Sequence, residues 1–186
     1  LASGFVAGPP ARVPVDDFPL STDWDYYGPI WTEFGPTPAF PYDWSPDGLI
    51  IVHEAAPAGL RVVEAASGAY YLMRSSGLNP RWSPVRTDGT TRIVFIEFES
   101  GAGSSVHTVR PDGTGDIVLA SYNPGSINGN YINGSSSAVF SPHGSQVIYE
   151  VIKVAQKVFA SQMVYSVPAT GGRAQALTSD LDFSTP

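Results

Sequence analysis

The chain has 186 residues, a formal net charge of −7 at pH 7, 42% hydrophobic residues and no cysteine. This length fits one domain with a substantial buried core, whereas the acidic balance argues against the basic footprint that nucleic acids and anionic membranes require. The absence of cysteine excludes disulfides, thiolate metal sites and cysteine nucleophiles, and no apolar run approaches the ~20 residues of a membrane-spanning helix.

Residues 1–39 form a segment rich in proline and aromatic residues, in which we expect an outer strand over 10–20 and an inner strand over 29–34. The segment begins without methionine or a basic region, as either a mature terminus or the start of a fragment would. Two interpretations of its aromatic side chains are open: they form an interface with a partner, or they pack the strands. The candidate partner contacts in this segment are Trp24, Tyr26, Tyr27 and Trp31.

The first of three sequence repeats spans 40–79 and contains a motif, referred to below as the repeated phrase, that returns in the other two repeats. The sequence Trp-Ser-Pro-Asp-Gly occupies 44–48 and is followed at once by an apolar run. Proline presets φ for a tight turn, and Asp-Gly tolerates positive φ, so the phrase predicts a hairpin turn between an inner strand and the next strand. Further strands are expected over 49–53, 60–64 and 69–73.

The second repeat, over 80–137, begins with Trp-Ser-Pro at 82–84 and has Asp-Gly only at 88–89. Strands are expected over 92–98, 105–109 and 116–120. The stretch 121–137 is rich in glycine, asparagine and serine, which predicts an inserted loop. Its candidate partner contacts are Tyr122, Asn128 and Tyr131.

The third repeat, over 138–186, has Phe-Ser-Pro-His-Gly at 140–144, with strands expected over 146–152, 163–167 and 173–177. The anchor aromatics Trp44 and Trp82 lie 38 residues apart, and Trp82 and Phe140 lie 58 apart. A four-stranded propeller blade takes roughly 40–50 residues. The pattern therefore predicts an all-β protein, a β-propeller or part of one, with three to four antiparallel four-stranded blades.

The Trp-Ser-Pro-Asp-Gly phrase and the later Val-Pro-Ala-Thr-Gly-Gly at 167–172 resemble the β-propeller repeat of TolB-type proteins, over about 40–186. Three repeats do not comfortably close a ring, since propellers have four to eight blades. Three resolutions are open: the chain is part of a longer protein, another copy or partner completes the ring, or residues 10–34 supply a last blade.

Neither a metal site nor a nucleophile is expected. Asp-Gly at 47–48, 88–89 and 112–113 lies between apolar strands and is interpreted as turn chemistry, and Asp23-x-Asp25 and Asp180-x-Asp182 as a repeated linking turn. His53, His107 and His143 fall in different repeats without metal-ligand spacing. Serines at 104–105 and 135–137 lack the Gly-x-Ser-x-Gly elbow, so a Ser/His/Asp triad has no support in the sequence.

These features predict a chain that is not an enzyme and needs no cofactor. The expected function is a protein-protein interaction module, periplasmic or extracellular, that acts as an accessory subunit of an envelope or membrane-associated complex. Its partner would be a protein or further blades. The alternative is the propeller domain of a larger peptidase or polysaccharide-acting enzyme, because TolB-type propellers resemble domains of such enzymes, or a carbohydrate-binding propeller.

Overall fold

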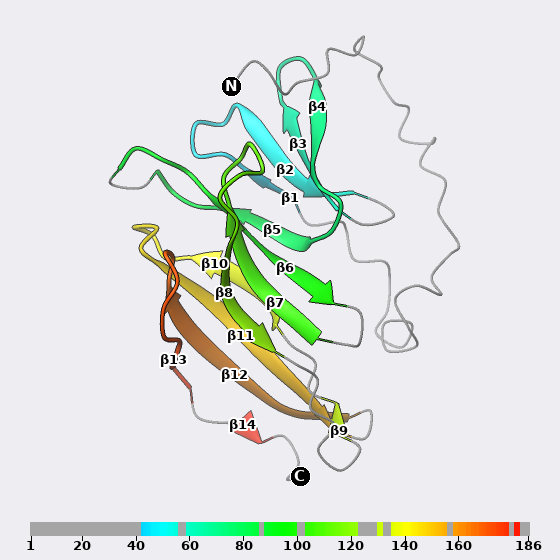
Figure 1. The fold of residues 1–186 in the computed structure, drawn as a ribbon, viewed down its shortest axis with the longest axis vertical. Coiled ribbons are helices and arrows are strands. Elements are labelled where there is room, and N and C mark those ends of the chain that lie inside the picture. The colour runs from blue at the N-terminus through cyan, green and yellow to red at the C-terminus, as the bar shows by residue number, and fades with distance from the viewer. Residues whose placement is uncertain are drawn as a thin grey trace, which may run out of the picture.

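The computed structural model describes residues 42–55, 59–85, 88–99, 103–122, 130–131, 135–155, 158–178 and 181–182. Within these ranges the chain forms β-strands and turns, and no helix there is long and apolar enough to cross a membrane. The strands make three antiparallel sheets that follow one another along the long axis of the molecule (Figure 1). The protein is thus all-β, and its sheets are the blades of a β-propeller.

Blade 1 is a four-stranded meander in which each strand pairs with the next along the chain. Its strands are β1 (Tyr42–Trp44), β2 (Ile50–Glu54), β3 (Leu60–Glu64) and β4 (Tyr70–Arg74). Blade 2 repeats this order. Its strands are β5 (Leu78–Trp82), β6 (Ile93–Glu99), β7 (Gly103–Val109) and β8 (Ile117–Tyr122). The strands expected from the sequence are confirmed in both blades to within two residues at nearly every end.

Blade 3 contains the same four-stranded path with two short additions. Its path is β10 (Ser135–Phe140), β11 (Gln146–Ala155), β12 (Val158–Pro168) and β13 (Gln175–Ala176). The short strands β9 (Asn130–Tyr131) and β14 (Leu181–Asp182) pair with β11 and β12. The β11–β12 hairpin is longer than expected, and β13 is shorter.

The expectation of a loop throughout 121–137 is wrong in part. Strand β8 continues to Tyr122, β10 begins at Ser135, and β9 pairs opposite Val154 and Ala155. The physical reason is that β11 extends beyond its expected end and offers an edge for pairing. Asn128 lies outside the described residues.

The serine of the repeated phrase has the same structural task in each blade. The hydroxyls of Ser45, Ser83 and Ser141 accept hydrogen bonds from the backbone N–H of the residue that begins or precedes the next strand, at 2.9, 2.8 and 3.1 Å. Gly48 and Gly144 close the turns at φ 71° and 66°, in the left-handed region that favours glycine. The repeated phrase therefore encodes the turn between the first two strands of a blade.

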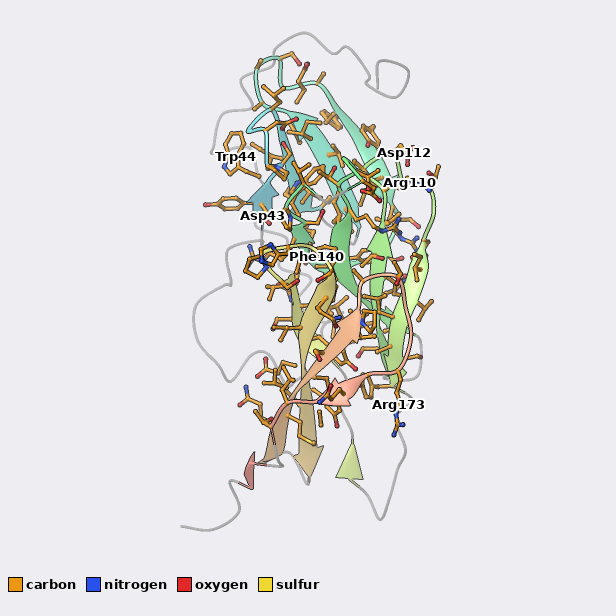
Figure 2. The ribbon with its side chains drawn as sticks, turned by 90° about the vertical axis from the view of Figure 1, so that its left-hand side faces the viewer. Asp43, Trp44, Arg110, Asp112, Phe140 and Arg173 are labelled. Atoms are coloured by element: carbon orange, nitrogen blue, oxygen red, sulfur yellow. The ribbon has the colours of Figure 1, made fainter. Side chains whose placement is uncertain are left out.

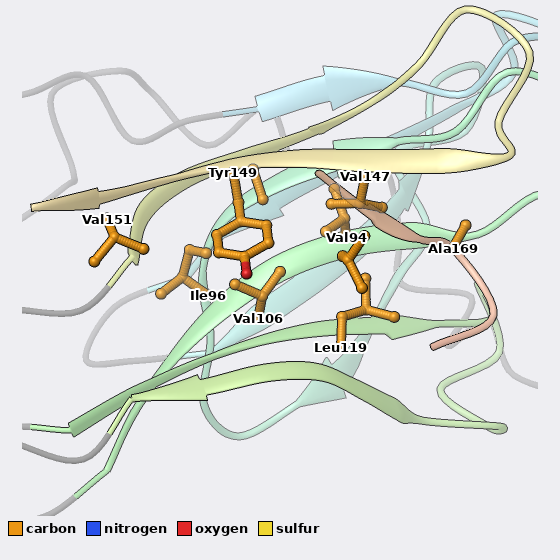
Figure 3. Packing of buried hydrophobic residues seen from close by; sticks show 10 residues of the cluster. Val94, Ile96, Val106, Leu119, Val147, Tyr149, Val151 and Ala169 are labelled. Carbon is orange, nitrogen blue, oxygen red and sulfur yellow. The ribbon is translucent and has the colours of Figure 1, made fainter. Parts of the chain in front are cut away.

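Two apolar cores lie between the blades. The core between blades 1 and 2 joins Val52, Leu60 and Val62 to residues of β5–β7. The core between blades 2 and 3 joins Val94, Ile96 and Val106 to residues of β10–β12, as Figure 3 shows. Because both faces of blade 2 are covered, the apolar residues 93–96 of β6 are fully buried. Strand β7 is buried along its whole length, although it carries the polar side chains Ser104, Ser105, His107 and Thr108.

Candidate functional site

The most concentrated set of polar side chains in the described residues lies between blades 1 and 2. We call it the inter-blade polar cluster; it comprises Arg74, Ser76, Glu97, Ser105, His107 and Asp116. Arg74 ends β4 and Ser76 lies in the link to β5, so blade 1 and its link contribute two members. Blade 2 contributes the others from β6, β7 and the residue before β8.

Strand geometry brings three of these side chains into one line. Ser105 and His107 are two residues apart on β7, so their side chains share one face of the sheet. Ser105 Oγ lies 2.8 Å from His107 Nε2, and His107 Nδ1 lies 2.9 Å from Asp116 Oδ1. Glu97, opposite Ser105 in the register of β6 and β7, has Oε2 3.7 Å from His107 Nε2.

Arg74 joins this line to blade 1. Its guanidinium donates to Asp116 Oδ2 at 2.8 Å and to Glu97 Oε2 at 3.0 Å, and Ser76 donates to the other oxygen of Glu97. The guanidinium also lies 5.0 Å from the ring centre of Phe95, on which the His107 ring stacks at 5.2 Å. One cation thus holds two carboxylates of the neighbouring blade over a buried aromatic ring.

The order of hydrogen bonds is that of a serine, histidine and aspartate relay, which the sequence analysis did not predict. Ser105 is only 1% exposed and His107 only 7%, so a substrate cannot reach the hydroxyl as the blades stand. The cluster links two blades, and its charged side chains Arg74, Glu97 and Asp116 are 20–32% exposed to solvent. The spacing Ser105-x-His107 indicates in the sequence that the two side chains share one face of a strand. The contact of Arg74 with Glu97 and Asp116 depends on the packing of the two blades and has no signal in the sequence.

Among the described residues, no group of three or more His, Asp or Glu side chains is arranged to hold a metal ion. The interpretation of the Asp-Gly pairs as turn chemistry is confirmed. Asp88 Oδ1 accepts from the N–H and hydroxyl of Thr90, and Asp112 Oδ1 does the same with Thr114. The hydrogen bond from Thr114 lowers the pKa of Asp112.

Asp47 and His53 also have local roles. Asp47 Oδ1 accepts from the Ser45 hydroxyl at 2.5 Å and from the Leu49 N–H at 3.0 Å, and the bond from Ser45 lowers the pKa of Asp47. His53 is half-buried, with Nδ1 2.6 Å from the Glu54 carbonyl oxygen. Neither residue faces a set of converging catalytic groups among those described.

Of the sequence-predicted partner contacts, only Tyr122 and the backbone of Tyr131 fall within the described residues. Tyr122 is half-buried, and its hydroxyl donates to the Tyr149 hydroxyl at 2.9 Å between blades 2 and 3. Burial, then this hydrogen bond, raises the pKa of Tyr122. Tyr131 is described only as a backbone member of β9. The other candidates, Trp24, Tyr26, Tyr27, Trp31 and Asn128, lie outside the described residues.

A hollow of about 410 Å³ lies beside β13 and the two residues that precede it. It is lined by Arg173, Ala174, Gln175 and Ala176. Figure 2 shows the Arg173 side chain projecting from this segment, far from Trp44. The hollow therefore offers a cationic side chain next to small and amide side chains.

Comparison with known proteins places the fold. No family model and no curated protein matches the chain. An oligogalacturonate lyase from Vibrio parahaemolyticus shares 9% identity at a TM-score of 0.51, over 77% of this chain and 40% of the lyase. A variant of Synechocystis apocarotenoid oxygenase shares 13% identity at a TM-score of 0.48, over 77% and 35%.

A 6-phosphogluconolactonase-like protein from Bacteroides uniformis shares 13% identity at a TM-score of 0.42, over 76% of this chain and 39% of that protein. The chain thus spans between a third and two-fifths of the solved structures to which it is similar. At these identities the likeness shows the propeller fold.

The expectation that the chain is not an enzyme is wrong by this comparison. The blades resemble part of an enzyme, the oligogalacturonate lyase, at a TM-score of 0.51. That expectation rested on the absence of a recognisable catalytic motif in the 186 residues. A catalytic site is assembled in the fold from residues that can lie far apart in the sequence, so a local motif is not required.

Proposed function

We propose that these blades are part of the β-propeller of an enzyme that acts on a polysaccharide or oligosaccharide. One observation supports this proposal: the successive four-stranded blades, with apolar cores between them, resemble an oligogalacturonate lyase over 77% of the chain. Both the interaction module and the propeller of a peptidase fit the blades less well, because the neighbour with a TM-score of 0.51 is a carbohydrate-acting enzyme.

The substrate class that this proposal favours is an acidic saccharide. In a lyase reaction a base takes the proton from the carbon beside a uronate carboxyl group, and the freed electron pair forms a carbon–carbon double bond. The glycosidic oxygen leaves with the electrons of its bond to carbon and takes up a proton, so no water is consumed. A cation that pairs with the carboxylate supports this chemistry, and arginine pairs with carboxylates through two parallel hydrogen bonds. Arg173, beside the hollow of about 410 Å³, is the side chain that we assign to this contact.

The test is an activity assay on the full gene product with oligogalacturonate, followed by the ultraviolet absorbance of the unsaturated product. We expect turnover, and we expect Arg173→Ala to raise KM by about tenfold, the effect of losing a charge-assisted pair of ~1.5 kcal/mol. Arg110→Ala is the matched control, since Arg110 also lies in an exposed turn before an outer strand. Cleavage of peptide substrates without action on the saccharide would overturn the proposal in favour of the peptidase alternative.

A further inference from the structure

Each described interface follows one rule: a blade covers one face of the blade that comes next in the chain. We call the covered face the back face. On blade 2, blade 1 covers Trp82, Ile93, Phe95 and Val109, which are 0–7% exposed. On blade 3, blade 2 covers Ala138, Val147, Tyr149 and Val167, which are 0–1% exposed.

The register identifies the same face on blade 1. Trp82 pairs with Ile93 and Ile93 with Val109, and in blade 1 Trp44 pairs with Ile51 and Ile51 with Val63. The back face of blade 1 is therefore Trp44, Ile51 and Val63. Trp44 is 49% exposed where Trp82 is 7% exposed, and Ile51 and Val63 are half-buried. Figure 2 shows Trp44 at the edge of the molecule.

We propose that residues 1–41 of this chain pack on the back face of blade 1. In both described interfaces the covering segment is the one immediately N-terminal to the covered blade. Residues 1–41 hold that position, and they end next to Tyr42, the first residue of β1. Their length of 41 residues matches the 38 residues from Trp44 to Trp82, which is one repeat.

Charge supports this occupant independently. Arg61 lies on the back face, because it is two residues from Val63 on β3 and pairs with His53, which is two residues from Ile51 on β2. Its guanidinium lies 5.2 Å from the ring centre of Tyr70. Its Nε is buried and makes no hydrogen bond to any residue that the structure describes. Residues 1–41 carry one arginine and five acidic residues, Asp16, Asp17, Asp23, Asp25 and Glu33. A carboxylate from this segment would satisfy the buried Arg61 donor.

The outer strand of blade 1, β4, need not be buried by the covering segment, as the comparison with blade 2 shows. Leu72 on β4 pairs with Arg61 as Val118 on β8 pairs with His107, so the two residues hold equivalent places. Leu72 is 56% exposed and Val118 is 55% exposed, although blade 1 covers the back face of blade 2. A cover on blade 1 thus needs to bury only β1–β3, where the apolar contacts lie.

Thiol labelling tests the proposal in the full chain, because the sequence contains no cysteine. The probe is Trp44→Cys, and the control is Val118→Cys, at an exposed site that the cover does not reach. With Ellman's reagent we expect the Trp44→Cys thiol to react at least about tenfold more slowly than the control, since a covered thiol reacts only through local opening. In urea the two rates should agree.

Two more variants identify the occupant. Arg61→Glu should repel the acidic segment and raise the labelling rate of Trp44→Cys, whereas Arg110→Glu in an exposed turn should leave it unchanged. Val63→Cys repeats the measurement with the tryptophan in place. Rates equal to the control in the folded monomer would overturn the proposal. Protection only in a dimer fraction after size exclusion would also overturn it, because a second copy would then be the cover.

Discussion

Replacing Arg74 by methionine tests whether the inter-blade polar cluster holds blades 1 and 2 together. The variant keeps the apolar stem but removes the pairs with Asp116 and Glu97 and the contact with the Phe95 ring. Because these groups are a fifth to a third exposed, each pair is worth about 1 kcal/mol, between the values for surface and buried pairs. The ring contact adds about 0.5–1 kcal/mol.

We therefore expect Arg74→Met to lower the free energy of unfolding by about 2–3 kcal/mol, since the two carboxylates also lose their shared cation. Urea unfolding followed by circular dichroism and by tryptophan fluorescence measures this change. Arg110→Met is the control, with an expected change below ~0.5 kcal/mol for an exposed turn residue. A loss of unfolding free energy no larger than that of Arg110→Met would refute the reasoning, because the cluster would then contribute nothing to the stability of the packed blades.

Three further predictions concern single buried groups. Burial raises the pKa of Glu54, so the folded chain binds its proton more tightly than the unfolded chain. The protonated carboxyl group of Glu54 therefore favours the folded state at acid pH, and this contribution is lost as the pH rises from the ordinary pKa of 4.5 through the raised pKa. Because glutamine stays neutral, Glu54→Gln should increase the free energy of unfolding in urea more at pH 7 than at pH 4. Gly77→Ala should cost about 2–4 kcal/mol in thermal melts, because φ is 124° and a Cβ would lie 2.8 Å from Phe95 Cδ2. Tyr122→Phe should cost about 1–2 kcal/mol, because the buried Tyr149 hydroxyl loses its donor.

Controls keep these three predictions specific. Gly68→Ala also has a positive φ, 71°, but its Cβ would meet no atom within 4 Å, so it should cost only about 1 kcal/mol. A loss equal to that of Gly77→Ala would show that backbone strain, not the Phe95 contact, sets the cost. A stability gain for Glu54→Gln that does not change with pH would contradict the assigned pKa. An unchanged melting temperature for Tyr122→Phe would show that water replaces the lost donor.

The sequence by itself determined the blade pattern. The Ser-Pro turn and the apolar run after it are local signals, because proline, glycine and the serine hydroxyl act within about five residues of their own position. The second, third and fourth strands of each repeat, from 49–53 to 173–177, were predictable for the same reason. The ends of β11 and β12 and the strand β9 were not, since they depend on pairing between distant segments.

The inter-blade polar cluster was decided only by the tertiary structure. Ser105 and His107 lie on one strand face, as alternation predicts, but Arg74 reaches Glu97 and Asp116 across 23 and 42 residues of sequence. The same holds for the exposed Trp44, whose equivalent Trp82 is buried although both stand in the same phrase. Local sequence fixes how a strand turns and which residues alternate, whereas burial and ion pairing depend on which blade packs against which.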